Sequence, residues 1–249
     1  MKILYLDFFL GMEVEMFLGA LLSLGEDKDA LEKELKAVFP SACIILSDVK
    51  RAGLESLRAD VVFESDRCFG CDEAMEYVNS NICDGALAKH LKKIIEIYFS
   101  YDKNAVIKEI EICKIYALCL AFKAIGADYV ISSEVSEGSG FCEKDGGYFM
   151  IPSASAVEIF EKYHIRIRLA EIEKELTGTL GASVLASLVN EYGAMPEMDI
   201  EKIGYGAGKE DFELANIMRA VVGSSNENQL GKMFESEDLF MEISEEIFV

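Results

Sequence analysis

The apolar positions of the chain fall into short blocks whose spacing changes from block to block. Residues 2–9 form a nearly continuous apolar run that ends before Gly11, which is typical of a buried β-strand. Within residues 13–24 the apolar side chains recur every three or four positions, so this segment is predicted to be an amphipathic helix. Gly25 ends that helix, and Asp27 is a good N-cap for a second helix over residues 28–38.

The rest of the chain continues to interleave strand-like and helix-like blocks. Helical spacing predicts further helices over residues 72–78, 85–99, 104–124, 155–163 and 180–191. Short apolar or β-branched runs predict strands over residues 42–47, 60–63, 129–133, 165–169, 199–206 and 217–222. Residues 50–58 fit neither pattern, and residues 138–147 are predicted to form a glycine-rich turn. This alternation predicts an α/β or α+β fold, with a mixed β-sheet and packed helices.

Composition narrows the class of protein. Hydrophobic residues make up 51% of the 249 residues and the mean hydropathy is +0.19, so the chain has the material for a sizeable core. With 24 Lys and Arg against 45 Asp and Glu, the formal net charge of −21 disfavours nucleic acid and anionic membrane as partners. No apolar run approaches the ~20 residues of a membrane span. Seven cysteines without a secretory signal indicate a reducing, cytoplasmic compartment.

Two carboxylates near the start of the chain are candidate ligands. Asp7 lies at the carboxyl end of the first predicted strand, where open α/β sheets collect their ligand sites and where a carboxylate suits a metal ion or a sugar hydroxyl. Glu15 follows in the first turn of the predicted helix. The alternative is that Asp7 is an ordinary polar residue at a strand end and that Glu15 is an exposed helix carboxylate.

Glycine-rich segments and a cysteine pair add further candidates. Gly138 and Gly140, and a second segment of Gly204, Gly206, Gly208 and Lys209, can present backbone N–H groups and an ammonium to an anion. Tight turns or a kinked strand explain the same glycines by backbone needs alone. The Cys68 and Cys71 thiols have the Cys-x-x-Cys spacing of metal and redox sites, but no second pair accompanies them.

The order of these segments resembles a known family. The residues that carry the resemblance are Leu4–Asp7 with the helix after them, then Glu137–Phe141, Glu175–Thr177 and finally Ile203–Lys209. In this order they resemble the LarC family of nickel-insertion proteins, over residues 1–223. The resemblance implies nickel insertion into a pyridinium dithiocarboxylate mononucleotide, with formation of carbon–nickel and sulfur–nickel bonds. It also implies a CTP-dependent step, with a divalent metal, on a C-terminal domain; residues 224–249 are predicted to be a linker and the start of that domain.

The chain departs from the family at polar positions. Where the family has a histidine-rich stretch this chain has residues 102–107, and two family aspartates are matched by Ile110 and Lys114. The two histidines of the chain, His90 and His164, match none of the family's positions. The resemblance therefore leaves Asp7 and Glu15 as the surviving nickel ligands or hydrogen-bond acceptors. It implies that Glu175, Thr177 and the glycine turns hold the phosphate or the carboxylates of the precursor.

These departures keep two other functions open, and no catalytic residue is assigned. The chain can be a non-catalytic binding or scaffold protein that kept the fold and serves a second copy or a paralogue as partner. It can also be a thiol-based metal or redox module at Cys68 and Cys71. A small-molecule nucleotide precursor, and nickel as its cargo, are the ligands of the leading hypothesis.

Overall fold

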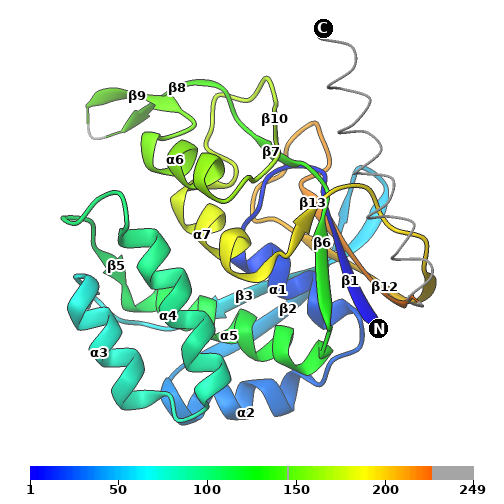
Figure 1. Ribbon diagram of the computed structural model, residues 1–249, viewed down its shortest axis with the longest axis horizontal. Helices are drawn as coiled ribbons and strands as arrows, with labels where there is room; N and C mark the ends of the chain where they lie inside the picture. Colours follow the sequence, from blue (N-terminus) through cyan, green and yellow to red (C-terminus); the bar gives the residue numbers. More distant parts are fainter. Residues whose placement is uncertain (145, 226–249) are drawn as a thin grey trace, which may run out of the picture.

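A computed structural model of the chain describes residues 1–144 and 146–225. The helices of these residues are α1 (Val14–Ser23), α2 (Lys28–Val38), α3 (Cys71–Asn81), α4 (Gly85–Phe99), α5 (Glu109–Ile125), α6 (Ala154–Lys162) and α7 (Gly178–Leu188). The strands are β1 (Lys2–Phe8), β2 (Cys43–Arg51), β3 (Leu54–Val62), β4 (Cys68–Phe69), β5 (Ile107–Lys108), β6 (Tyr129–Ser132), β7 (Val135–Glu137), β8 (Gly140–Lys144), β9 (Gly147–Ile151), β10 (Ile167–Leu169), β11 (Glu191–Tyr192), β12 (Asp199–Ala207) and β13 (Ile217–Ser224). Figure 1 shows their arrangement.

The central element is a mixed sheet with the strand order β11-β6-β1-β13-β12-β3-β2. Strands β11, β6 and β1 run parallel to one another, β13 runs antiparallel to both β1 and β12, and β2 and β3 form an antiparallel hairpin. The short strands β7 and β10 pair in parallel, and β8 and β9 form a separate hairpin. The predicted α/β class, with a mixed sheet and packed helices, is confirmed. None of the helices in the described residues combines the length and apolar character that a membrane crossing needs.

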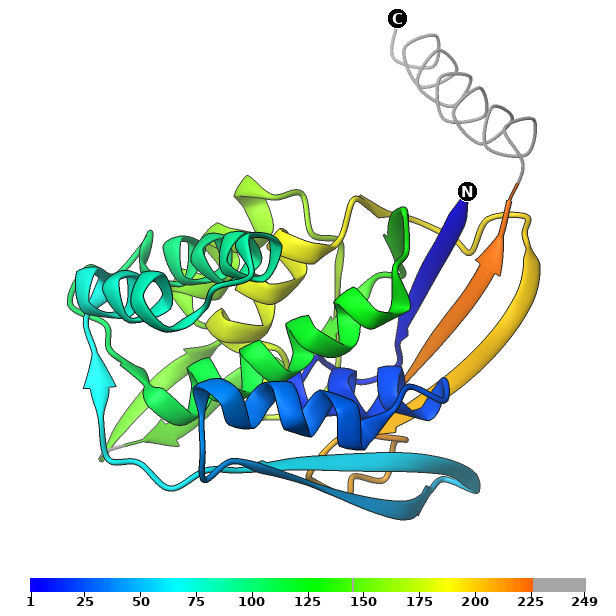
Figure 2. The ribbon, with the colours of Figure 1, turned by 90° about the horizontal axis from the view of Figure 1, so that it is seen from below.

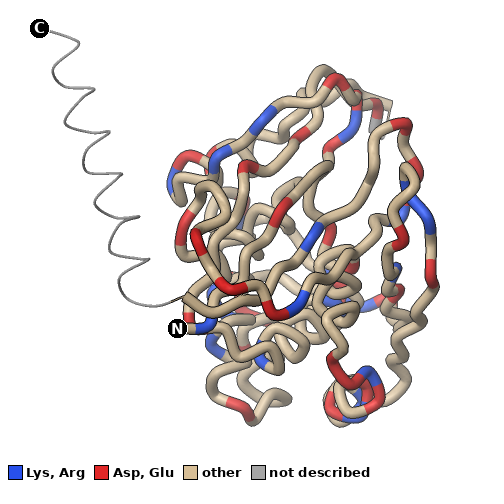
Figure 3. The backbone as a smooth tube through the Cα atoms, turned by 90° about the vertical axis from the view of Figure 1, so that its right-hand side faces the viewer, with Lys and Arg blue, Asp and Glu red and all other residues tan. Residues whose placement is uncertain are grey.

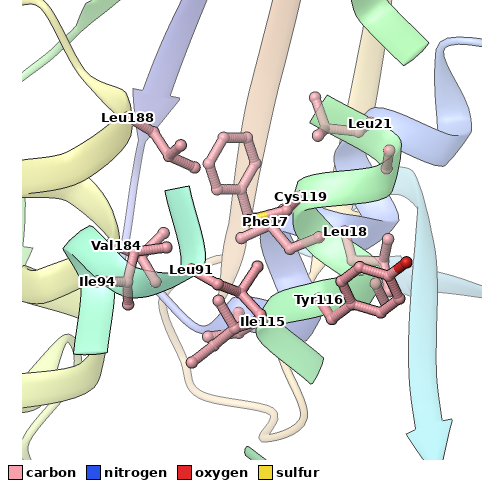
Figure 4. Packing of buried hydrophobic residues seen from close by; sticks show 14 of the residues in the cluster. Phe17, Leu18, Leu21, Leu91, Ile94, Ile115, Tyr116, Cys119, Val184 and Leu188 are labelled. Carbon is pink, nitrogen blue, oxygen red and sulfur yellow. The ribbon is translucent and has the colours of Figure 1, made fainter. Parts of the chain in front are cut away.

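The main core lies between the sheet and the helices, which pack on the same side of it (Figure 2). Alternate residues of β1 face opposite sides: Leu4 and Leu6 belong to the main core, whereas Ile3 and Tyr5 belong to a small second cluster. Figure 4 shows how side chains from four helices meet in the main core, with Phe17 of α1, Leu91 of α4, Cys119 of α5 and Val184 of α7 among them. All seven helices of the described residues contribute side chains to this core, so the sheet and the helices share one hydrophobic core.

Helix α1 lies unusually close to the sheet because glycines remove the side chains between them. A Cβ placed on Gly206 of β12 would lie 1.9 Å from the Met16 carbonyl oxygen, and one on Gly204 would lie 2.4 Å from the Ala20 carbonyl oxygen. From the helix side, a Cβ on Gly19 would lie 2.4 Å from the Leu57 carbonyl oxygen. Real Cβ atoms do not approach so closely, so these positions require glycine for packing.

Several predicted boundaries are wrong for identifiable reasons. Residues 50–58, predicted to be irregular, are the ends and the turn of the β2–β3 hairpin, and the turn places Ala52 and Gly53 at positive φ. The helix predicted to start at residue 104 starts at Glu109, because Ile107 and Lys108 pair with β4. Most of the turn predicted over 138–147 is β-structure. The helix predicted over 180–191 ends at Leu188, and β11 follows it.

Ser224, the first residue of the segment predicted over 224–249, is the last residue of β13 and pairs with both Lys2 and Asp199. The part of that segment beyond residue 225 lies outside the described residues. A domain boundary at residue 223 stays a prediction.

The close packing of Gly206 against α1 predicts a large difference in the free energy of unfolding between two Gly→Ala variants. Gly206→Ala should lower the free energy of unfolding by about 3 kcal/mol or more, since either α1 or β12 must move. Gly85→Ala, in α4 where nothing lies within 4 Å of the added Cβ, should be neutral or slightly stabilising. Urea unfolding of both variants checks this, and equal destabilisation would contradict the packing role of Gly206.

A second prediction concerns Glu32, which ties α2 to β2. Hydrogen bonds from Lys36, from the Ile44 backbone N–H (3.1 Å) and from Lys28 lower the pKa of Glu32 to about 2. A depressed carboxyl pKa contributes stability above the ordinary pKa of 4.5, and this contribution is lost as the pH falls towards about 2. Glu32→Gln should therefore cost about 1 kcal/mol at pH 7 and progressively less below pH 4.5. Thermal unfolding at pH 7 and at a pH below 4.5 tests this. The control is Glu34→Gln, which removes an exposed carboxylate and should have little effect at either pH.

Candidate functional site

A polar hollow of about 270 Å³ lies at the start of α1, beside α5 and the start of α7. It brings together three residues predicted from the sequence: Glu15, Glu175 and Thr177. Two further charged side chains, Glu111 and Lys114, extend into it from α5. The hollow is named the α1–α5–α7 pocket below.

The centre of the α1–α5–α7 pocket is an ion-paired lysine. The Lys114 Nζ atom lies 3.1 Å from a carboxylate oxygen of Glu15 and 3.1 Å from one of Glu111. Burial by itself lowers the pKa of Lys114, but the two carboxylates outweigh it and raise the pKa above its ordinary value. The second Glu15 oxygen accepts a hydrogen bond from the Val61 N–H at 2.8 Å. Glu15 is thus fully engaged, and an ammonium already supplies the positive charge that its carboxylate favours.

The wall formed by residues 175–178 is fixed by a buried carboxylate that the sequence reasoning did not single out. Glu137, at the end of β7, accepts hydrogen bonds from four backbone N–H groups, of Gly138 (2.8 Å), Leu176 (2.6 Å), Thr177 (3.0 Å) and Gly178 (3.2 Å). Its side chain is fully buried, and burial raises its pKa although the four donors act in the opposite direction. The only sequence signal was a glutamate directly before the Gly138 segment.

Thr177 and Glu175 have further fixed contacts. The Thr177 hydroxyl donates to the Ser136 carbonyl oxygen at 3.2 Å, and Glu175 accepts from the Ser153 N–H at 3.1 Å. Thr177 is the N-cap residue of α7, and its hydroxyl makes no cap hydrogen bond to that helix. The two side chains therefore belong to the pocket wall, and their role towards a precursor stays a prediction.

Asp7 does not share this pocket. It lines a separate cleft on the other side of the segment after β1, and it forms an ion pair with Arg219 of β13, Nη2 to Oδ2 at 2.5 Å. The Arg219 guanidinium also lies over the Phe9 ring, 5.6 Å from its centroid. Asp7 and Glu15, the two carboxylates predicted to ligate nickel, are each neutralised by a basic side chain. A nickel ion would have to displace Arg219 or Lys114 to reach them.

The predicted glycine sites are explained largely by packing. A Cβ on Gly138 would lie 1.8 Å from the Lys174 carbonyl oxygen, and one on Gly208 would lie 2.3 Å from the Asn216 side chain. Gly140 has a φ of 99°, a conformation that favours glycine. The Lys209 N–H donates to Glu13 at 3.3 Å, which ties the end of β12 to the start of α1. An anion-binding role of these glycines and of Lys209 stays a prediction.

Cys68 and Cys71 sit where β4 meets α3. Cys68 is exposed and Cys71 is partly buried, and all seven cysteines are free. Burial, followed by the negative charges of Asp72 and Glu96, raises the pKa of the Cys71 thiol, which disfavours the thiolate that metal binding or redox exchange needs. Within residues 1–144 and 146–225, no group of three or more His, Cys, Asp or Glu side chains is arranged to hold a metal ion.

A charged hollow lies at the carboxyl ends of the parallel strands, the place where α/β proteins commonly bind small molecules. The profile of the nickel insertion protein family matches residues 4–242, so the chain belongs to this family. The family resemblance drawn from the sequence is confirmed.

Curated relatives carry the name pyridinium-3,5-bisthiocarboxylic acid mononucleotide nickel insertion protein. The relative from Acetivibrio thermocellus is 26% identical, over 92% of this chain and 62% of its own length. That from Thermotoga petrophila is 28% identical over 89% of this chain and 61% of its own, and that from Clostridium kluyveri is 28% identical over 92% and 64%. The chain thus spans about three fifths of the length of these relatives. No solved structure matches it.

The ion pairs in the α1–α5–α7 pocket predict the effect of removing Lys114. Lys114→Gln leaves Glu15 and Glu111 facing one another without a cation, so the variant should bind Ni²⁺ about tenfold more tightly than the parent chain. Calorimetric titration with Ni²⁺ measures this, and Lys123→Gln, which removes the same charge from a pair with Asp84 on another part of the surface, is the matched control. Equal nickel affinities of the Lys114→Gln variant and the parent chain would refute it.

Proposed function

We propose that this chain takes part in nickel insertion into a pyridinium-type mononucleotide, the activity named for its relatives. The observation that carries the proposal is the convergence of Glu15, Glu175 and Thr177 in one pocket of a chain that belongs to the nickel insertion family. The part of the reaction that this pocket supports is holding the precursor and the nickel substrate. The CTP-dependent step implied by the family resemblance is not assigned to any described residue.

The pocket supplies acceptors and one ammonium for this task. Glu175 and the Thr177 hydroxyl offer oxygen atoms to a polar ligand, while Lys114 can attract one of the precursor's acidic groups. When such a group pairs with Lys114, the contact between Lys114 and Glu15 weakens, and the Glu15 carboxylate becomes available to Ni²⁺. Nickel binding that depends on the precursor follows from this exchange of partners.

A second candidate is a non-catalytic binding protein that retains the fold, and one observation favours it. Both carboxylates predicted to ligate nickel are held in ion pairs, Asp7 with Arg219 and Glu15 with Lys114. Its partner would be a second copy of the chain or a full-length relative. The β8–β9 hairpin suits such a contact, since Phe141, Tyr148, Phe149 and Met150 are all exposed on it. Either function fits a reducing cytoplasm, in which all seven cysteines stay free.

The deciding experiment is a calorimetric titration of the reduced, metal-free protein with Ni²⁺, with and without the pincer precursor. Micromolar binding that requires the precursor and falls at least tenfold in Glu15→Gln is the expected result. The control is Glu34→Gln, which removes an exposed carboxylate on α2, away from the pocket, and should leave the titration unchanged.

Other results would select the other functions. Binding that is lost only in Cys68→Ser would move the nickel site to the thiols. Absence of nickel binding under both conditions, together with a concentration-dependent dimer in analytical ultracentrifugation, would replace nickel insertion with the binding-protein function.

A further inference from the structure

The cleft that contains Asp7 lies at the place where α/β sheets bind ligands. It has a volume of about 390 Å³, within the range of small-molecule sites. Its walls include the ends of the three parallel strands: Asp7 and Phe8 at the end of β1, Ser133 after β6, and Gly193 after β11. In open α/β sheets the crevice at the carboxyl ends of such strands is the usual ligand site. We call it the strand-end cleft.

Two arginines enter the strand-end cleft from the segment of β10. Arg166 and Arg168 are two residues apart, both are exposed, and both line the cleft. Arg168 donates from Nη2 to the Ser136 hydroxyl at 2.9 Å. The Arg166 guanidinium makes no hydrogen bond or ion pair with any described residue. Most of their donors are therefore free to bind a ligand.

The positions of the arginines indicate where this strongly acidic chain has a locally positive surface. The chain has 45 Asp and Glu against 24 Lys and Arg, and acidic positions recur along the backbone throughout the view of Figure 3. Of its six arginines, two line this cleft, and a third, Arg219, pairs with Asp7. Only the exposed Glu134 remains among the lining residues to offset Arg166 and Arg168. The cleft is thus locally positive in a molecule that otherwise repels anions.

We propose that the strand-end cleft binds the phosphate monoester of a mononucleotide, with Arg166 and Arg168 as the phosphate ligands. A guanidinium presents a planar fork of donors that matches two phosphate oxygens, and two such forks on one strand suit a dianion. The choice of phosphate rests on the arginines, and the choice of a mononucleotide rests on the proposed function. The inference assigns the phosphate to this cleft in place of Thr177 and the glycine turns.

Ser136 connects the strand-end cleft to the α1–α5–α7 pocket. Its hydroxyl accepts from Arg168 and donates to the Phe9 carbonyl oxygen at 3.0 Å, while its own carbonyl oxygen accepts from the Thr177 hydroxyl. Phosphate binding that reorients Arg168 would act on Ser136 directly, and through it on Thr177. The two hollows are therefore neighbours that share one hydrogen-bonded residue.

The test is calorimetric binding of nicotinic acid mononucleotide to the full chain without nickel. The parent chain should bind it, and Arg166→Gln and Arg168→Gln should each weaken binding at least tenfold. Arg168→Lys, which keeps the charge and loses the fork, should also weaken it. Arg58→Gln is the matched control, because Arg58 pairs with Asp60 on β3 and should leave binding unchanged. Arg166 has no hydrogen bond or ion pair from its guanidinium to any described residue, so its variant should keep the fold, which thermal unfolding verifies.

Two further probes separate the sources of the phosphate. Nicotinic acid riboside, which lacks the phosphate, should bind the parent chain and the arginine variants alike. If inorganic phosphate binds as tightly as the mononucleotide and with the same dependence on Arg166 and Arg168, the mononucleotide assignment is overturned. Unchanged mononucleotide affinity in both variants, or no binding by the parent chain at millimolar concentration, overturns the cleft as a phosphate site. Nickel is absent from these titrations, so their failure leaves the nickel-insertion proposal to its own experiment.

Discussion

The near contact between the backbones of α1 and the sheet is the constraint on which the rest of the structure depends. Gly204 and Gly206 on the sheet and Gly19 on the helix allow main-chain atoms to meet where side chains would normally intervene. The helix axis is consequently held in one place, against β12 and β3. Glu15 can then reach both Val61 on β3 and Lys114 on α5. The glycines thus act on the site through the position of a helix.

Charge neutralisation within the protein organises the two hollows in different ways. In the α1–α5–α7 pocket one ammonium is shared by two carboxylates, and a buried glutamate fixes the wall opposite. In the strand-end cleft Asp7 is taken up by its ion pair with Arg219, so Arg166 and Arg168 have no acidic partner among the described residues. One hollow therefore keeps an excess of carboxylates around its single ammonium, whereas the other has positive charge to offer a ligand. This asymmetry arises on either side of the same short segment after β1.

Periodicity in the sequence was sufficient for the elements that have one apolar face. The helices α1 and α2 and the strand β1 follow their predicted ranges closely, and Asp27 caps α2 as expected, accepting from Asp29 and Ala30. The outer parts of β2 and β3 were predicted as strands, but the turn of their hairpin and the residues beside it were missed because the polar residues and the Ala52–Gly53 turn lack an alternating pattern. Arg166, Arg168 and Glu137 were not recognised because their significance depends on contacts between distant segments. Asp7 and Glu15 were located correctly as strand-end and helix-start residues, but their basic partners were beyond the reach of local patterns.

Lys114 gives the α1–α5–α7 pocket a counter-ion that is covalently part of the chain. A bound metal ion exchanges with the medium, is removed by chelators and competes with other divalent ions for its ligands. The Lys114 ammonium does none of these things because it is covalently attached to the chain. The charge of the pocket without a ligand therefore does not depend on the metal content of the medium. A pocket built in this way stays empty of stray metal until a ligand draws the lysine aside.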